Sequence, residues 1–312
     1  MLSRIAESLY WVGRYVERAE DTARILDVHL HRMLEDPAVD EVAACHMLLD
    51  AMCAETPPTV NASAITHVLA FDRANTSSIV GALVAARENA RGSREILSSE
   101  MWQCLNATYN AVDEQVTVAG GMRLHAFFSW VKERGAIVAG LADSTMTRDD
   151  AWRFLVLGRS LERVDMTARL LWASFSDPAD TTDLVATLRS CSAQEAFLRT
   201  YRRAADPATV AEFLLLDRLF PRSALYSLMV AERCLAELDP RAGRLGLADE
   251  ARRILGKARN NLEYANMAEM FQDLPSHLRS LQTACAAAGE AVARRFFQQT
   301  SVEWSLEGAT RP

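Results

Sequence analysis

The sequence predicts an all-α protein, built as a multi-helix bundle. Half of the 312 residues are apolar, which is ample for a buried core. The chain has only 13 glycines and 9 prolines and few long β-branched runs, so strands are not expected. Apolar residues recur every three or four positions in most windows, which is the period of an amphipathic helix. Turn signals separate the helical segments at Pro57-Pro58, Gly120-Gly121, Asp143-Ser144, Asp177-Pro178, Asp206-Pro207, Asp239-Pro240 and Leu274-Pro275.

The first helix is predicted around residues 9–26. On a helical projection one stripe of this segment is apolar, and it is made by Leu9, Val12, Tyr15, Val16, Ala19, Ala23 and Leu26. The adjacent sector is polar and carries Arg14, Glu17, Glu20, Asp21 and Arg24. We therefore expect this helix to bury one face and to hold a charged face beside it.

The charged sector of this helix occurs a second time along the chain. Residues 13–26 and 158–171 are identical at 8 of 14 positions, with an offset of 145 residues. In the apolar stripe, core residues replace one another, as Leu161 replaces Val16. In the charged sector the residue type is kept, in the pairs Arg14/Arg159, Glu17/Glu162, Arg18/Arg163 and Arg24/Arg169, while Glu20/Asp165 keeps a carboxylate. A helix used only for packing would show the opposite pattern, so the charged face is constrained in both copies.

Two further helix starts are predicted at the same offset. Asp72-Arg73 aligns with Asp217-Arg218, and each pair precedes a helical run. In the first run Asn75 or Thr76 is the expected N-cap and the helix extends to Leu97. In the second run Pro221 suits the first helical position and the helix extends to about Leu238.

These matches indicate one tandem duplication of a helical unit. Residues 147–150 resemble a capping box, with Asp150 in place of glutamate, and open the second copy. We expect a first repeat over 1–145, a second over 146–300 and a flexible tail over 301–312. The two repeats are expected to pack about a pseudo-twofold axis as one compact unit.

Composition excludes several classes of partner. The net charge of −7 argues against general nucleic-acid binding. The six cysteines are dispersed without a C-x-x-C pair, which is typical of a reducing compartment. No apolar run approaches 18 residues, and the N-terminus lacks a basic start followed by an apolar block. We therefore expect a cytoplasmic protein that binds neither membrane nor nucleic acid.

The carboxylates of the charged face raise the question of a metal site. Glu17 and Glu20 are three residues apart, as are their counterparts in the second copy, so four carboxylates could converge if the copies pack together. Di-iron bundles use such glutamates, but they combine them with a histidine three residues on, and this chain has none there. Arginines also surround the carboxylates. We therefore predict no metal site.

Three other uses of the charged face stay open. One is a set of intrahelical ion pairs, each worth only about 0.2–0.5 kcal/mol. Another is an interior network that fixes the orientation of the packed helices. The last is a face that binds an anionic or peptide-like ligand. The expected intrahelical pairs are Arg14–Glu17, Glu20–Arg24, Arg159–Glu162 and Asp165–Arg169.

A second charged cluster includes Arg87, Glu88 and Asn89. Arg87 shares one helix side with Arg91 and Arg94, so a solvated face is the simplest interpretation. Asparagine has mediocre helix propensity, so Asn89 in mid-helix slightly favours a specific hydrogen-bonding role. The chain contains no P-loop, no glycine-rich dinucleotide turn, no G-x-S-x-G and no H-E-x-x-H.

The opening residues Met1 to Glu20, MLSRIAESLYWVGRYVERAE, closely resemble the bacterial alpha-E domain family. The run Ala85 to Arg91 and the motif at 158–171 are also similar to that family. The resemblance covers nearly the whole chain. It implies a helical domain that is encoded beside, or fused to, a circularly permuted ATP-grasp protein, often with a transglutaminase-like protein nearby.

This resemblance implies a cytoplasmic peptide- or amide-ligation system with a peptide or amino-acid substrate. ATP and Mg²⁺ would bind the ATP-grasp partner, and this chain would need no cofactor. Candidate positions for ligand binding or docking, from the resemblance and the repeat together, are Arg14, Glu17, Arg18, Glu20, Arg24, Arg87, Glu88, Asn89, Arg159, Glu162, Arg163, Asp165 and Arg169.

Three hypotheses follow for the function. The first is an accessory or co-catalytic subunit of the ligase. The second is a stand-alone enzyme that uses the converging carboxylates, with or without a metal. The third is a purely structural interaction module. Whether the chain is itself catalytic stays open at the level of the sequence.

Overall fold

The fold of the computed structural model is all-helical over the residues it describes, which are 2–119, 123–175, 184–240 and 249–297. The helices of the first half are α1 (Ser3–Glu35), α2 (Glu41–Met52), α3 (Ala62–Thr66), the π-helical segment η1 (His67–Phe71), α4 (Ile79–Gly92), α5 (Ser99–Ala119) and α6 (Leu124–Thr145). Those of the second half are α7 (Asp150–Phe175), α8 (Leu184–Ser190), α9 (Gln194–Tyr201), α10 (Pro207–Leu216), α11 (Ala224–Leu238), α12 (Glu250–Glu263), α13 (Met267–Gln272), α14 (Leu274–Val292) and the π-helical η2 (Ala293–Phe297). The predicted all-α class is confirmed.

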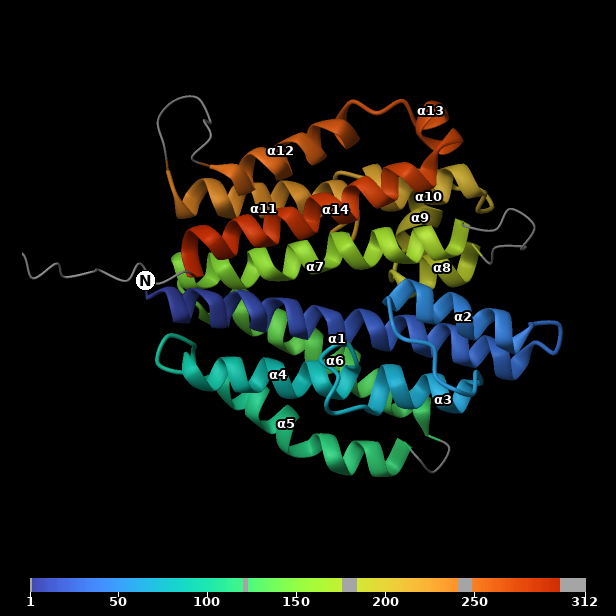
Figure 1. The fold of residues 1–312 in the computed structure, drawn as a ribbon, viewed down its shortest axis with the longest axis horizontal. Helices are drawn as coiled ribbons and strands as arrows, with labels where there is room; N and C mark the ends of the chain where they lie inside the picture. The colour runs from blue at the N-terminus through green and yellow to red at the C-terminus, as the bar shows by residue number, and fades with distance from the viewer. Residues whose placement is uncertain (1, 120–122, 176–183, 241–248, 298–312) are drawn as a thin grey trace, which may run out of the picture.

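Helices α1 and α7 lie side by side across the middle of the molecule (Figure 1). Helices α4, α5 and α6 lie on the α1 side, whereas α11, α12 and α14 lie on the α7 side. Both central helices are buried along most of their length because layers cover them from both directions. The charged motif of the sequence therefore lies at the centre of the fold and not on its surface.

Each central helix also contacts a short helix from the other half of the chain. Helix α2 packs against α7, and α8 packs against α1. The two halves are therefore joined by α1 and α7 and by these two exchanged contacts. Separating them would expose apolar residues of both central helices, which disfavours independent movement of the halves.

Two glycines allow the backbones of α1 and α7 to approach closely. A Cβ atom on Gly13 would lie 2.0 Å from the carbonyl oxygen of Leu155. A Cβ atom on Gly158 would lie 2.0 Å from the carbonyl oxygen of Tyr10. Any larger residue would force the helices apart. This close crossing brings the charged side chains that follow each glycine within reach of the opposite helix.

Serines cap the helices α4 and α11, and the predicted starts at Asn75 or Thr76 and at Pro221 are wrong by two or three residues. The Ser78 hydroxyl accepts from the backbone N–H of Gly81 and donates to the carbonyl of Asp72 at 2.5 Å. Ser223 accepts from Tyr226 and donates to Asp217 in the same way. Each serine thus closes the preceding turn and begins the helix.

Other predicted boundaries also shift. Helix α4 ends at Gly92 and not at Leu97, because the N–H of Ser93 donates to Ala90 and closes the last turn. Asp149, and not Thr147, accepts the first free N–H groups of α7. Asp143-Ser144 lies in the last turn of α6, whereas the signals at Pro57, Pro207, Pro240 and Pro275 fall between helices or at their ends. Gly120-Gly121, Asp177-Pro178 and the tail 301–312 lie outside the described residues.

No helix of the described residues has the length and apolar character that crossing a membrane requires.

Candidate functional site: the arginine–carboxylate network between α1 and α7

Glu162 of α7 is held by two arginines of α1. Its Oε2 atom lies 2.5 Å from Nε of Arg14, and its Oε1 atom lies 2.5 Å from Nε of Arg18. A further bond of 3.2 Å joins Nη2 of Arg18 to Oε2. The glutamate side chain is 2% exposed, whereas the arginines are 14% and 18% exposed. The carboxylate is therefore buried, while each guanidinium reaches from it toward the surface.

Glu17 of α1 is held by arginines of the second half. Arg163 of α7 donates from Nε to Oε1 at 2.5 Å and from Nη2 to Oε2 at 2.8 Å. Such a bidentate pair fixes the relative orientation of both side chains. Arg222, in the turn before α11, adds a third bond of 3.1 Å to Oε1. The helices therefore exchange arginine–glutamate contacts in both directions.

Arg222 also binds the other carboxylates of α1. It donates from Nη2 to Glu20 at 2.5 Å, and its Nη1 atom contacts Asp21. Glu20 is bound in addition by Arg24 at 2.6 Å, and Arg24 donates onward to the hydroxyl of Ser192 at 2.5 Å. One arginine thus meets three carboxylates, and the last turn before α11 is tied to α1.

The predicted intrahelical pairs are present in part. Glu20–Arg24 forms, and Asp165–Arg169 forms at 2.9 Å. Arg14 does not pair with Glu17, because the close crossing brings Glu162 nearer to it. Arg159 does not pair with Glu162, since both oxygens of Glu162 are taken by arginines of α1. Spacing along one helix could not indicate that the partner would come from another helix.

Burial and charge set the pKa values of these carboxyl groups. Burial alone would raise the pKa of Glu17, but Arg163 and Arg222 outweigh it and lower this pKa to about 2. For Glu162, Arg14 and Arg18 likewise overcome burial and lower the pKa. Asp21 shows the opposite balance. Burial, together with the neighbouring carboxylates, raises its pKa to about 7 although Arg222 opposes the shift.

The same contacts shift the pKa values of the arginines. Burial would lower the pKa of Arg14, but Glu162 outweighs it and raises the value. The pKa of Arg159 is instead lowered, by burial and by the nearby charge of Arg163. No ion pair to Arg159 is found among the described side chains. Arg163 and Arg222 supply the hydrogen bonds to Glu17 instead.

The cavities beside the network are small. One is lined by Glu17, Glu20 and Arg159 and measures about 10 Å³, and another beside Asp21 and Arg222 has the same volume. Each is no larger than a single water. Within the described part of the chain, no group of three or more histidine, cysteine or acidic side chains is arranged to hold a metal ion.

The cluster at Arg87 is directed toward α5. Arg87 donates to Asn106 at 3.2 Å and lies over the rings of Trp102 and Tyr109, at 5.5 and 4.8 Å from their centroids. Glu88 pairs with Arg87 at 2.5 Å. Asn89 donates to the carbonyl of Ala85 one turn earlier in its own helix. Arg87 therefore fastens α4 to α5, whereas the contacts of Glu88 and Asn89 stay within α4, and all three lie away from the network between α1 and α7.

Two members of the network could not be singled out from the repeat. Arg222 aligns at the offset of 145 with Ser77, and Asp21 aligns with Met166, so neither is duplicated. One signal does exist in the sequence. The face of α1 carries three carboxylates within five residues, and their burial requires more positive charge than α1 itself supplies.

Fold and network define a helical protein whose two longest described helices are joined by reciprocal arginine–glutamate pairs. The profile of the Alpha-E family, described as a predicted alpha-helical domain with a conserved ER motif, matches residues 1–297. The chain belongs to this family. It contains four Glu-Arg dipeptides, and only Glu17-Arg18 and Glu162-Arg163 have a buried glutamate.

Three relatives are uncharacterized proteins of mycobacteria. One is from Mycobacterium bovis and two are from Mycobacterium tuberculosis, strains CDC 1551 and H37Rv. Each is 26% identical over 342 residues, and the match covers 99% of this chain but 38% of the relative. This chain therefore spans less than half the length of these relatives. No solved structure matches the chain significantly.

Proposed function

We propose that this chain is a helical accessory subunit of an ATP-grasp-dependent system that forms peptide or amide bonds, and that its arginine–carboxylate network is structural. The proposal rests on the observation that the glutamates of the network are already paired with arginines of this chain. Glu17, Glu20 and Glu162 each already accept two guanidinium groups. A catalytic carboxylate needs access to a substrate, and the neighbouring cavities admit no more than water.

Family membership supports the choice of partner. The resemblance to alpha-E proteins implies a neighbouring or fused circularly permuted ATP-grasp protein, and a transglutaminase-like protein is a further candidate. In the mycobacterial relatives the matching region is the smaller part of a longer chain. A domain that occurs as part of a longer chain is suited to act together with other domains. In this proposal ATP and Mg²⁺ bind the ATP-grasp protein.

Co-expression with the ATP-grasp protein encoded nearest to this chain tests the proposal. We expect the two to co-purify as a complex through size-exclusion chromatography, and we expect the isolated chain not to hydrolyse ATP. A chain that hydrolyses ATP alone would contradict the accessory role. Recovery of no ATP-grasp protein from cells that express both at native levels would contradict the partnership.

We also infer that the two halves arose by duplication at the offset of 145 residues. The helical stretch 62–71 corresponds to α10 at 207–216, and the start of α4 at 79 corresponds to the start of α11 at 224. Arg18 donates to the carbonyl of Thr76, and its counterpart Arg163 donates to that of Pro221, which is the counterpart of Thr76. The glycine contacts and the serine caps correspond in the same way.

A crystal structure tests the duplication. Residues 3–92 should superimpose on 148–237 after a rotation of about 180°, as expected for a pseudo-twofold axis. Helices that correspond at the offset of 145 residues but do not superimpose after this rotation would contradict the duplication.

A further inference from the structure

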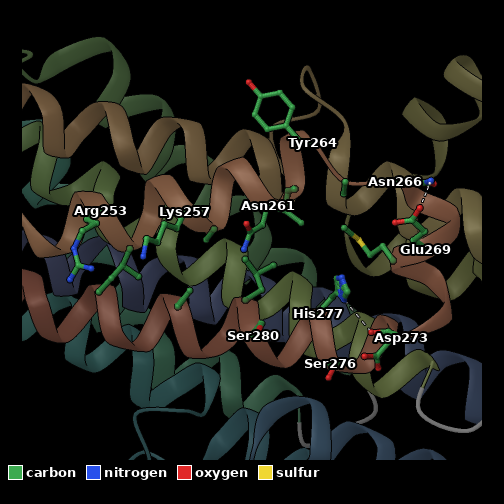
Figure 2. A pocket seen from close by; sticks show the side chains of 17 residues that line it. Arg253, Lys257, Asn261, Tyr264, Asn266, Glu269, Asp273, Ser276, His277 and Ser280 are labelled. Atoms are coloured by element: carbon green, nitrogen blue, oxygen red, sulfur yellow. Dashed lines mark hydrogen bonds between the residues drawn. The ribbon is translucent and has the colours of Figure 1, made fainter. Parts of the chain in front are cut away.

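An open groove lies between α12 and α14 (Figure 2). These two helices lie on the side of the molecule away from α1 (Figure 1). Its volume is about 770 Å³, which is in the range of ligand-binding pockets. Leu262, Met270 and Leu281 form a buried apolar floor. The rims are polar and exposed. A floor of this kind with charged rims is suited to a ligand that lies along the groove.

The two ends of the groove carry opposite charge (Figure 2). Arg253 and Lys257, one turn apart on α12, line one end. The Nε atom of Arg253 is buried without a hydrogen-bond partner, and no ion pair to either cation is found among the described residues. Two neighbouring cations that form no ion pair favour an anionic group of a ligand, because a carboxylate placed there would form charge-assisted hydrogen bonds with both.

Carboxylates line the other end. Glu269 of α13 and Asp273, in the turn before α14, are exposed on the rim. The Oε1 atom of Glu269 accepts a bond of 3.0 Å from Asn266, and no partner of its Oε2 atom is found among the described residues. The break that places these residues here has a local cause. Pro275 lies in the first turn of α14, where it cannot continue the helix from α13, so α13 turns aside at Asp273.

We propose that this groove binds a short peptide with two free ends, its carboxylate at Arg253 and Lys257 and its ammonium group at Glu269 and Asp273. From Arg253 to Glu263, its last residue, the helix α12 rises about 15 Å. An extended peptide of about five residues has this length. Between the charged ends, Asn261 and Ser280 offer polar groups to a peptide backbone from opposite rims. The inference does not rest on the partnership with an ATP-grasp protein.

Backbone amide NMR of the whole chain tests the groove, with a randomised pentapeptide pool as probe. The pool is used with free ends, with an amidated C-terminus or with an acetylated N-terminus. Free peptides should shift amides of α12, α13 and α14, and either cap should weaken binding about tenfold or more, because each removes a charge-assisted contact. Equal response to capped and free pools, or no response at millimolar concentration, would overturn the proposal.

Variants and one further ligand complete the test. Arg253→Gln/Lys257→Gln should abolish the preference for a free carboxylate, whereas Arg279→Gln, an exposed arginine of α14 outside the groove, should leave it unchanged. Dependence on the carboxylate alone, with the acetylated pool binding normally, would indicate the C-terminal tail of a protein instead. Inorganic phosphate that reproduces all shifts would indicate a simple anion site. Both results contradict the proposal, and neither bears on co-purification with the ligase.

Discussion

Replacing Glu162 by glutamine is expected to destabilise the protein strongly. Glutamine keeps the shape of the side chain but removes the charge that holds Arg14 and Arg18. Its amide nitrogen is a donor, so it faces the N–H groups of the arginines without forming a bond with them. Two guanidinium groups, each less than one fifth exposed, are then left without their counter-charge. Breaking a buried pair from one side costs about 3–5 kcal/mol.

The expected shift in melting temperature follows from the size of the chain. Unfolding entropy is about 2.1 cal/mol/K per residue, so 312 residues give about 0.65 kcal/mol/K. A loss of about 3–5 kcal/mol therefore lowers the melting temperature by about 5–8 °C, if the chain unfolds as one unit. Differential scanning calorimetry at neutral pH measures this directly.

Glu133→Gln provides the matched control. Glu133 belongs to a Glu-Arg dipeptide as Glu162 does, but it is exposed on α6. Its replacement should change stability by less than about 0.5 kcal/mol, as surface substitutions usually do. If Glu162→Gln lowered the melting temperature no more than Glu133→Gln, the pairs between α1 and α7 would not hold the fold together, and the structural role would be refuted.

The remaining predictions concern the helix crossing and pH. Gly158→Ala should destabilise the protein by about 1–3 kcal/mol or more in urea titrations, because the added methyl group meets the carbonyl of Tyr10. Gly140→Ala should be neutral or stabilising, because no atom beyond its own helix lies within 4 Å of the added methyl group. Equal effects would contradict the close crossing. Because the pKa of Glu17 is lowered to about 2, its contribution to the stability of the folded state is present above pH 4.5 and is lost as the pH falls through 2. The variant Glu17→Gln should therefore weaken the dependence of unfolding on acid pH. The pKa of Asp21 is raised to about 7, so the native state binds its proton more tightly and stability falls as the pH rises from 4 to 7. Thermal melts of Asp21→Asn should show less decline over this range, and an unchanged pH profile would be the contrary result.

The fold class could be predicted from the sequence because helical periodicity is a local property. The stripe that begins at Leu9 indicates one buried face, and the structure buries all of it except Tyr15, which is partly buried. The first residues of the helices are harder to predict from the sequence. The serine caps depend on a turn that closes back to Asp72 or Asp217, and this contact extends over six residues. Asn75 and Pro221 have the right residue types, but they lie inside that turn.

The candidate site could be predicted only in part. Repetition marked Glu17, Arg18, Glu162 and Arg163 as constrained, and all four lie in the network between α1 and α7. Their partners could not be predicted, because an ion pair between helices depends on where the helices cross. Arg222 shows this most clearly, since it lies more than 200 residues from the carboxylates that it binds.

The central claim is that the network holds the fold while partner binding occurs elsewhere. Co-purification of the ATP-grasp protein with the variant Glu17→Gln/Glu162→Gln tests it most directly, at a temperature where circular dichroism shows the variant folded. We expect a melting temperature well below that of the wild type together with an undiminished yield of partner. A variant that keeps the wild-type melting temperature but loses the partner would contradict the claim, because the carboxylates would then serve docking and not stability.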